Sequence, residues 1–352
     1  MVGRLSPRPT IACIAWVRED SRSSSIARAL GGEAQTFYDL GLHAKPLVPL
    51  RYLLSAVRTA AYLMRRRPRA VMVQAPPVPA VAIAWAWSRL ARVPLLIDSH
   101  PASFGTEDAR ADRIMRPLLA WLVPRAAGCI VTTPRLGEQI ARWGGRPIVV
   151  HEAPMPWGER IRQRGCSGDR RVLFVCTFAP DEPLMQTLEA AARLPDVTFA
   201  ITGDLRRLPE AARIAAPANV QWVGYLNSTD YVTALEQADV VMSLTKRAES
   251  VARSAHEAVD ALRPMVISGG PHMRDLFPYA VFVENNAESV AAGVAEALRR
   301  CQELSEQAGE ARSVQHRRWR EQLSDIESAL RAPGAARPRP TAGRLVGRAK
   351  PD

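Results

Sequence analysis

Short apolar runs alternate with amphipathic segments along the first part of the chain. In each amphipathic segment, apolar residues recur every three or four positions, which is the spacing of one helix face. The apolar runs predict strands over 10–17, 70–74, 94–98, 129–132 and 147–151. The amphipathic segments predict helices over 23–30, 51–66, 80–92, 114–123 and 135–142. Strand–helix alternation at this spacing predicts a parallel sheet with helices on both faces.

The pattern breaks at residues 153–169 and then begins again. That segment is rich in Pro, Gly and charged residues and has no steady period, so we interpret it as a linker between domains at 1–152 and 170–302. The second domain has expected strands at 171–176, 197–202, 220–223, 240–244, 264–267 and 281–283. Its expected helices are 184–194, 228–237, 250–262 and 287–300. A long polar helix over 303–331 follows, and the Pro-, Gly- and Arg-rich residues 332–352 are expected to be disordered.

Two doubly wound α/β domains joined by one linker restrict what the chain can do. In such sheets, ligands bind at the carboxyl ends of the strands. Two facing sheets can direct these ends into one cleft, and a final helix can cross back onto the first domain. This architecture suits an enzyme that brings two substrates together.

The distribution of charge is more informative than the net charge of +12. Residues 40–97 contain no acidic residue. The same stretch contains nine cations: Lys45, Arg51, Arg58, Arg65, Arg66, Arg67, Arg69, Arg89 and Arg92. Such a surface attracts polyanions, usually anionic lipid headgroups or nucleic acid. No nucleic-acid recognition motif with interleaved aromatic residues accompanies it, so we expect no nucleic-acid partner.

The expected helix at 50–66 has an apolar stripe within this basic stretch. The stripe is formed by Leu50, Leu53, Leu54, Val57, Ala61 and Met64. We expect it to pack on the sheet of its own domain. The arginines of the helix, with Trp85 and Trp87, are instead expected near an anionic bilayer. No apolar run reaches the roughly 20 residues that cross a bilayer, so we expect a cytoplasmic chain that can sit on the inner face of the cell membrane.

The cysteines and histidines show no metal-binding or disulfide pattern. The five cysteines lie far apart and form no CxxC pair, which argues against a disulfide framework or a zinc ribbon and fits a reducing cytosol. The six histidines show no HxxxH or HxH spacing. We therefore expect no zinc ribbon and no His-rich metal site.

The most informative motif lies in the second domain, within residues 219–270. Its marker residues are, in order, Asn219, Val220, Gly224, Ala238, Asp239, Val240, Glu249, Glu257, Ala258, Pro264 and Val266. Seven residues separate the two glutamates. This order and these gaps resemble the donor-binding half of the GT-B glycosyltransferases, specifically the retaining family 4 type. The resemblance implies two Rossmann-like domains facing across a cleft, the first on the acceptor side and the second binding a nucleotide-sugar. It also implies that no metal and no other cofactor is needed, and the sequence contains no DxD motif.

The resemblance also implies roles for particular residues. Glu257, inside the helix, would accept hydrogen bonds from ribose hydroxyls, and Glu249, before it, would hold the donor sugar as a catalytic residue. A helix N-terminus at Ser250 and Val251 would offer free N–H groups and a positive dipole end to the diphosphate. His100, which follows a strand of the first domain, would contact the sugar or the acceptor. The alternatives are two surface carboxylates and a loop histidine bonded to backbone.

The chain departs from the family at the expected diphosphate site. Family members carry an Arg…Lys-Gly clamp after the first strand of this domain, whereas residues 176–183 contain no cation. Stabilising the leaving group needs positive charge near the β-phosphate. The nearest substitutes are Lys246, expected to be catalytic, and the donor-binding Arg247 and Arg253. The other expected donor-binding residues are Thr177, Phe178, Gly203, Gly224 and Tyr225.

Three functions remain compatible with these observations. The leading one is a retaining glycosyltransferase with a lipid-linked or polysaccharide acceptor. A nucleotide-sugar epimerase or hydrolase on the same scaffold would act without an acceptor. A non-catalytic subunit that binds a partner glycosyltransferase or a membrane would explain the missing clamp.

Overall fold

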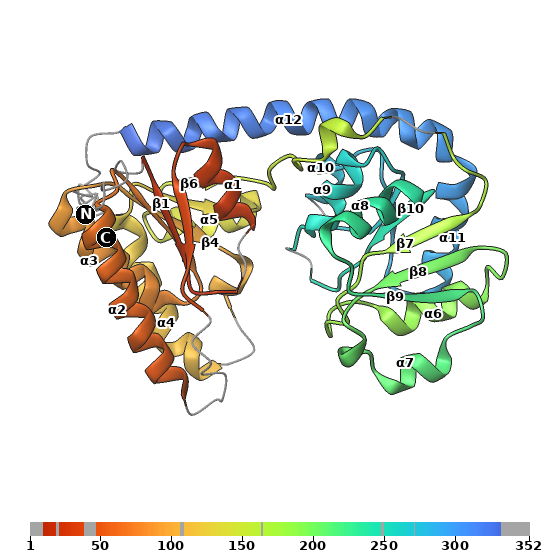
Figure 1. Cartoon of the computed structure of the whole chain (residues 1–352), viewed down its shortest axis with the longest axis horizontal. Coiled ribbons are helices and arrows are strands. Elements are labelled where there is room, and N and C mark those ends of the chain that lie inside the picture. Colours follow the sequence, from red (N-terminus) through yellow and green to blue (C-terminus); the bar gives the residue numbers. More distant parts are fainter. Residues whose placement is uncertain are drawn as a thin grey trace, which may run out of the picture. The chain divides into compact units, whose positions relative to one another are not determined.

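The chain divides into two compact units, each built around one parallel sheet (Figure 1). The structure, a computed structural model, describes residues 10–18, 21–38, 47–105, 109–162, 165–247, 250–270 and 272–331, without the side chains of 109–112. The first unit consists of Met1–Val149 with Ser324–Asp352, and the second of Val150–Leu323. Glu249 and the expected tail at 332–352 lie outside the described residues.

The first sheet has six parallel strands in the order β2-β1-β3-β4-β5-β6. The strands are β1 (Ala12–Ala15), β2 (Glu33–Thr36), β3 (Val71–Ala75), β4 (Leu95–Ser99), β5 (Gly128–Val131) and β6 (Pro147–Val149). All five apolar runs that predict strands here are confirmed. The pattern does not predict β2, because this edge strand is polar and no residue of it is fully buried.

Helices cover both faces of this sheet. They are α1 (Ser21–Ala29), α2 (Val48–Arg66), α3 (Val78–Ala91), α4 (Ala109–Leu122) and α5 (Pro134–Arg142). Figure 1 shows α2, α3 and α4 on one side of the strands and α1 on the other. Alternate strand residues such as Ile14, Val73 and Ile97 share a buried apolar core with α3 and α4. The side chains of Ile26 and Ala27 on α1 are also fully buried.

The helix α2 packs through a different face from the one expected. Its buried residues are Ser55, Thr59 and Leu63. The Ser55 hydroxyl donates to the Phe37 carbonyl (3.0 Å), and the Thr59 hydroxyl accepts from Trp16 Nε1 (2.9 Å). The expectation that the apolar stripe packs on the sheet is therefore wrong. Small hydroxyl residues, satisfied by hydrogen bonds, occupy the buried face instead, and the apolar stripe is left at the surface.

The second sheet has six parallel strands in the order β12-β11-β10-β7-β8-β9. The strands are β7 (Arg171–Phe174), β8 (Thr198–Thr202), β9 (Val220–Gly224), β10 (Val240–Ser243), β11 (Met265–Ser268) and β12 (Val281–Val283). All six expected strands are confirmed. This is the Rossmann order, in which the chain reverses direction across the sheet between β7 and β10. The loops after these two strands therefore diverge and leave a crevice between them.

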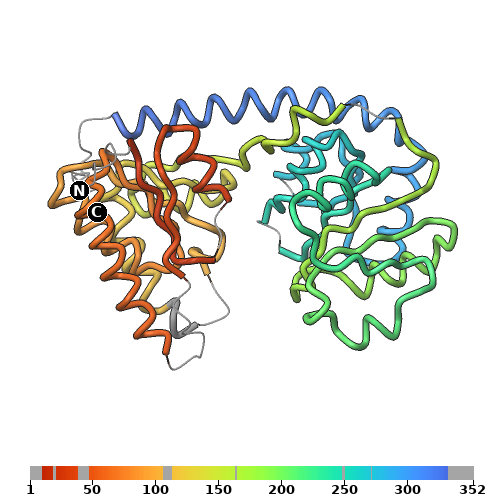
Figure 2. The backbone as a smooth tube through the Cα atoms, in the orientation of Figure 1, coloured from red at the N-terminus to blue at the C-terminus, as the bar shows by residue number. Residues whose placement is uncertain are grey.

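Helices also cover both faces of the second sheet. They are α6 (Leu184–Ala192), α7 (Glu210–Ala215), α8 (Ser228–Gln237), α9 (Arg253–Asp260), α10 (Met273–Leu276), α11 (Ala287–Arg299) and α12 (Cys301–Arg331). α6, α7 and α11 share one apolar core, whereas α8, α9, α10 and the start of α12 share another. The strand–helix alternation runs through both units (Figure 2), which confirms the expected fold class of two Rossmann-like units with a long C-terminal helix.

Asp260, the last residue of α9, anchors the beginning of the expected linker to the second unit. Its fully buried carboxylate accepts from the Met155 N–H (2.7 Å) and lies 2.9 Å from His316 Nε2 on α12. Nearby, Arg312 of α12 donates to the Gly158 carbonyl (2.9 Å). One buried carboxylate therefore joins three segments that are distant in the sequence.

Cys166 and Cys301 form a disulfide, which corrects the expectation drawn from cysteine spacing. Their Cα atoms are 6.1 Å apart although the residues are separated by 135 positions. Cys166 precedes β7 and Cys301 begins α12, so the pair meets only once the second unit has folded. Local spacing carries no information about such a pair.

We predict that this disulfide stabilises the second unit. A crosslink that closes a long loop restricts the unfolded chain and typically contributes about 2–4 kcal/mol. Replacing both Cys166 and Cys301 by Ser should lower the free energy of unfolding in urea by that amount, and reductant should not destabilise the variant further. Unfolded, non-reduced wild type should show two fewer titratable thiols than reduced protein. Equal thiol counts before and after reduction would contradict the assignment.

Candidate functional site

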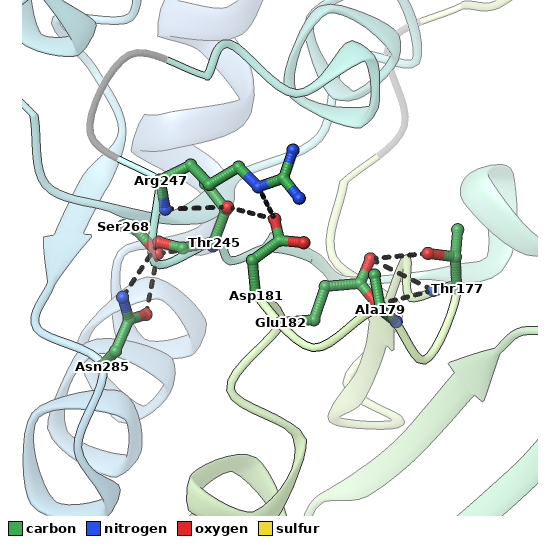
Figure 3. Close-up of polar contacts among 8 residues, drawn as sticks. All are labelled: Thr177, Ala179, Asp181, Glu182, Thr245, Arg247, Ser268 and Asn285. Carbon is green, nitrogen blue, oxygen red and sulfur yellow. Dashed lines mark hydrogen bonds and ion pairs between the residues drawn. The ribbon is translucent and has the colours of Figure 1, made fainter. Parts of the chain in front are cut away.

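Asp181 joins the two loops that diverge between β7 and β10. It lies in the loop after β7, and its carboxylate accepts a hydrogen bond from the Thr245 hydroxyl in the loop after β10 (2.9 Å). Arg247 Nε lies 3.3 Å from the same carboxylate, as Figure 3 shows. The Asp181 carbonyl also accepts from the Lys246 N–H (2.7 Å). Asp181 thus positions two of the expected donor-site cations at the carboxyl end of the sheet.

A second set of hydrogen bonds joins the ends of β10, β11 and β12. The Thr245 N–H donates to Ser268 Oγ (2.9 Å), and this hydroxyl donates to Asn285 Oδ1 (2.8 Å). The Asn285 amide returns a hydrogen bond to the Thr245 carbonyl (2.9 Å). The three residues form a closed ring (Figure 3), so the base of the site is held by both backbone and side chains.

A pocket of about 120 Å³ opens beside this ring. Residues that line it include Ser243, Lys246, Arg247, Ser250, Gly269 and Gly270. Three of the expected site residues, Lys246, Arg247 and Ser250, are thereby brought together. Cations, hydroxyls and glycines that leave the backbone accessible form a suitable environment for a phosphate group.

The helix α9 begins later than the sequence pattern predicts. Its first residue is Arg253 and its N-cap is Ala252, so Ser250 and Val251 precede the helix. The Ser250 N–H donates to the Arg247 carbonyl (3.2 Å) and is therefore not a free helical donor. Val251 packs against the apolar core. The expectation that these two residues form the helix N-terminus is wrong.

The positive end of α9 still borders the pocket. Ala252, the N-cap, is one of the lining residues. A hydrogen bond between the buried hydroxyls of Ser243 and Ser254 (2.6 Å) fixes the first turn of α9 to the end of β10. The helix dipole therefore favours negative charge at this side of the pocket.

Glu257 is buried on α9, one turn after Arg253. Its Oε2 accepts from the Tyr231 hydroxyl (2.5 Å) and its Oε1 accepts from Arg253 Nε (2.8 Å). Burial, the Glu257 charge and this hydrogen bond raise the pKa of Tyr231, so the phenol remains the donor. Each carboxylate oxygen keeps a second lone pair, so Glu257 can still accept a hydrogen bond from a ligand.

Glu182 occupies the backbone donors of the loop after β7. Its carboxylate accepts from the N–H groups of Thr177 (2.9 Å) and Ala179 (2.8 Å) and from the Thr177 hydroxyl (3.2 Å), as Figure 3 shows. An internal anion therefore takes the donors that a phosphate would use. With Asp181 beside it, this loop carries two carboxylates where the family pattern has a cationic clamp.

The remaining expected residues of this unit lie at the ends of β8 and β9. Gly203 has a positive φ of 136°, and a Cβ there would lie 2.5 Å from the Phe178 ring. The Phe178 ring also packs edge-on to Trp222, so it belongs to the core. The Gly203 N–H donates to the Gly224 carbonyl (3.0 Å), and the adjacent Tyr225 is 79% exposed. None of these residues lines the pocket between β10 and α9.

His100 lies in the first unit, directly after β4. Its Nε2 is 3.5 Å from the carboxylate of Asp98, which is fully buried. Asp98 pairs with the buried Arg22 of α1 and accepts from the Ser23 hydroxyl (3.3 Å). Burial alone would raise the pKa of Asp98, but the Arg22 charge and the nearby His100 outweigh it and lower the pKa to about 2. The imidazole therefore lies beside a carboxylate that is ionised at neutral pH.

Several residues of these clusters are absent from the sequence-based set. Asp181 and Glu182 follow a buried strand in the loop that lacks cations, and that pair of carboxylates is the signal that could have identified them. Tyr231, Asn285 and Asp98 have no local signal, because their partners are distant in the sequence. Glu249, expected to contact the donor sugar, lies outside the described residues, and its role stays a prediction.

Two doubly wound units, with a pocket suited to anions at the carboxyl ends of β10, β11 and β12 of the second, are the arrangement of the GT-B class of α/β enzymes. The sequence profile described as "Glycosyl transferase 4-like domain" matches residues 10–156, and the profile "Glycosyl transferases group 1" matches residues 159–313. The chain therefore belongs to the group 1 family of GT-B glycosyltransferases. A sequence search of curated proteins finds no match.

Solved glycosyltransferase structures share the fold of this chain. Sucrose-phosphate synthase from Thermosynechococcus elongatus is 14% identical with a TM-score of 0.67, covering 90% of this chain and 97% of that one. HepE from Anabaena, in complex with UDP-glucose, is 14% identical with a TM-score of 0.66 over 91% and 100% of the two chains. A UDP-forming α,α-trehalose-phosphate synthase from Burkholderia xenovorans is 12% identical with a TM-score of 0.64 over 92% and 99%.

We predict that Asp98 stabilises the first unit in a pH-dependent way. Its pKa in the folded state, about 2, is below the ordinary value of 3.8, so its contribution is present above pH 3.8 and is lost as the pH falls toward 2. Asp98→Asn removes a carboxylate from a buried guanidinium and should lower the free energy of unfolding by about 3 kcal/mol near neutral pH.

Urea denaturation of wild type and variant at several pH values measures this difference. The gap should narrow as the pH falls through the acidic range. Asp196→Asn is the matched control, because its partner Arg170 is exposed and such pairs contribute about 0–1 kcal/mol. A gap for Asp98→Asn as small as that of the control would refute the prediction.

Proposed function

We propose that the chain transfers a sugar from a nucleotide-sugar to a lipid-linked or polysaccharide acceptor, with retention of anomeric configuration and without a metal. The observation that carries the proposal is the pocket over the ends of β10, β11 and β12, where two cations and the start of α9 line a space suited to phosphate. The second unit would bind the donor and the first the acceptor. Retention is proposed because the spacing of Glu249 and Glu257 resembles that of retaining members.

In this proposal, Lys246 and Arg247 replace the missing diphosphate clamp. The loop after β7 cannot stabilise a departing diphosphate, because it carries the carboxylates of Asp181 and Glu182. Arg247 is partly neutralised by Asp181, whereas the exposed Lys246 side chain pairs with no carboxylate among the described residues. Lys246 is therefore the cation that would best stabilise the leaving group, assisted by the dipole of α9.

Glu257 would recognise the ribose of the donor. Tyr231 and Arg253 hold its carboxylate from two sides, so its orientation is set before the ligand arrives. A carboxylate with two oxygens in fixed positions suits the paired hydroxyls of a ribose. His100 and Glu249 would contact the sugar or the acceptor. UDP is the first nucleotide to test, because HepE was crystallised with UDP-glucose and the Burkholderia enzyme is UDP-forming.

We predict that a uridine nucleotide raises the melting temperature of the protein and that Glu257→Gln weakens this effect. A ligand that binds only the folded state stabilises it by mass action. Losing a hydrogen bond to a charged group should raise the Kd for UDP roughly tenfold to a hundredfold. The screen compares UDP, GDP, ADP and TDP. Glu189→Gln, on the exposed face of α6, is the control and should bind like wild type.

Lys246→Ala should lower kcat about a hundredfold or more while changing the Kd of the donor less, because the lost charge acts mainly on the leaving group. Arg193→Ala, which removes an exposed cation after α6, is its control.

The anomeric configuration of the product, measured by NMR, tests retention. A free sugar or an epimerised nucleotide-sugar would indicate a hydrolase or an epimerase, and an inverted product would exclude retention. Folded protein that binds none of the nucleotides would refute the donor site.

A further inference from the structure

The helix α2 exposes large apolar side chains on the side that faces away from its own unit. Leu53 is 61% exposed, and Val57 and Met64 are each 59% exposed. Leu50 and Leu54 are exposed as well, at 46% and 38%. Single exposed apolar residues are ordinary, but five on one helix form a continuous patch. We call these five residues the α2 stripe.

The α2 stripe lies opposite the buried face of the helix. Successive residues of an α-helix are about 100° apart, which puts the five residues of the stripe within an arc of about 100°. Ser55, Thr59 and Leu63, which are buried, are centred on the other side of the helix. Within the part of the chain that the structure describes, the helix therefore has one buried face and one exposed apolar face.

A row of arginines runs along one edge of the α2 stripe. Arg51, Arg58 and Arg65 follow one another at intervals of seven residues, so they lie on nearly the same line of the helix. The Arg51 guanidinium lies 5.2 Å from the centre of the Tyr38 ring, and Arg58 lies 5.9 Å from that of Phe37. These aromatic contacts support the side chains without neutralising their charge.

The neighbouring charges make the row strongly positive. Residues 40–97 contain no carboxylate, so nothing on α2 or α3 opposes the arginines. Arg66 is different, because it donates to both oxygens of Glu33 at 2.8 and 2.7 Å and lies on the side of the helix that holds Ser55 and Thr59. Trp85 and Trp87 pack partly against the core of the unit and do not belong to the stripe. None of the described helices is long and apolar enough to cross a bilayer.

We propose that α2 lies in the plane of an anionic lipid bilayer, with the α2 stripe in the acyl region and the arginine row at the headgroups. An apolar stripe edged by cations is the pattern of interfacial helices. Nucleic acid would attract the arginines but would gain little from five exposed aliphatic side chains. Figure 1 shows α2 among the helices that cover one face of the sheet of the first unit. This proposal does not depend on the identity of donor or acceptor.

The test is flotation of the full chain with vesicles of phosphatidylcholine alone or mixed with phosphatidylglycerol. Wild type should bind the mixed vesicles, and high salt should weaken binding. A variant with Arg51, Arg58 and Arg65 changed to Gln should lose about a hundredfold in partition coefficient. A variant with Leu53, Val57 and Met64 changed to Gln should lose a similar factor, because it keeps the charge but removes the apolar contact.

Matched controls separate the α2 surface from general effects. Changing Arg193, Arg317 and Arg320 to Gln removes the same net charge from exposed positions of the second unit, and Ile214→Gln removes an apolar side chain that is 77% exposed there. Both controls should bind vesicles like wild type, and all variants should keep the melting temperature and the nucleotide response.

Three outcomes would overturn the proposal. Wild type that floats with neither vesicle would exclude a bilayer partner. If the arginine variant of α2 and the arginine control of the second unit lose vesicle binding equally, the effect is due to net charge and not to the α2 surface. Vesicle binding that the stripe substitutions leave unchanged would show that the stripe does not contact the bilayer. If the same substitutions also abolish self-association in sedimentation, the stripe contacts a second copy of the chain. The nucleotide response of wild type, measured separately, distinguishes these outcomes from failure of the donor site.

Discussion

The reversal of strand order between β7 and β10 is the constraint on which the site depends. All six strands of the second sheet point the same way, so every loop after a strand leaves from one edge. At the reversal, adjacent strands continue to helices on opposite faces, and their loops separate. Asp181 holds the separated loops together through Thr245, Lys246 and Arg247. The pocket that can take a ligand lies next to this contact, over the ends of β10, β11 and β12, and this one carboxylate sets the positions of the two cations that line it.

The arrangement of charge follows from that contact. The acidic loop after β7 forms its own hydrogen bonds, because the Glu182 carboxylate accepts from the backbone N–H groups of Thr177 and Ala179. The cations stand one loop further along the sheet, after β10, where the first turn of α9 adds its dipole. An anion is therefore attracted toward β10–β12 rather than toward the turn after β7. The chain lacks the usual cationic clamp after β7 but has two cations, Lys246 and Arg247, that line the neighbouring pocket.

The parts of this structure that the sequence predicts are those governed by local pattern. Buried parallel strands are apolar on both faces, so eleven of the twelve strands in the described residues are visible as apolar runs. The polar edge strand β2 is not. The gathering of Lys246, Arg247 and Ser250 follows from strand–helix order, and the structure confirms that they meet. The late start of α9, the disulfide and the Asp98–Arg22 pair depend on partners far away in the sequence. On α2, periodicity reveals an apolar stripe but cannot tell which side faces the core, because Ser55 and Thr59 are buried through hydrogen bonds that no hydropathy scale registers.

That ambiguity on α2 has a physical consequence for the whole molecule. A helix whose buried face is closed by hydroxyl contacts gains nothing for folding from leucines on its other side, and exposed aliphatic patches promote aggregation in water. Their presence beside an arginine row is best explained by a second environment that is apolar and anionic. A nucleotide-sugar is a water-soluble dianion and suits the positive pocket of the second unit, whereas a lipid-linked acceptor is presented at a bilayer. If both proposals hold, the two units recognise the two substrates in different solvents. The second unit binds a charged donor from water, and the first unit lies at the bilayer, where a lipid-linked acceptor is found.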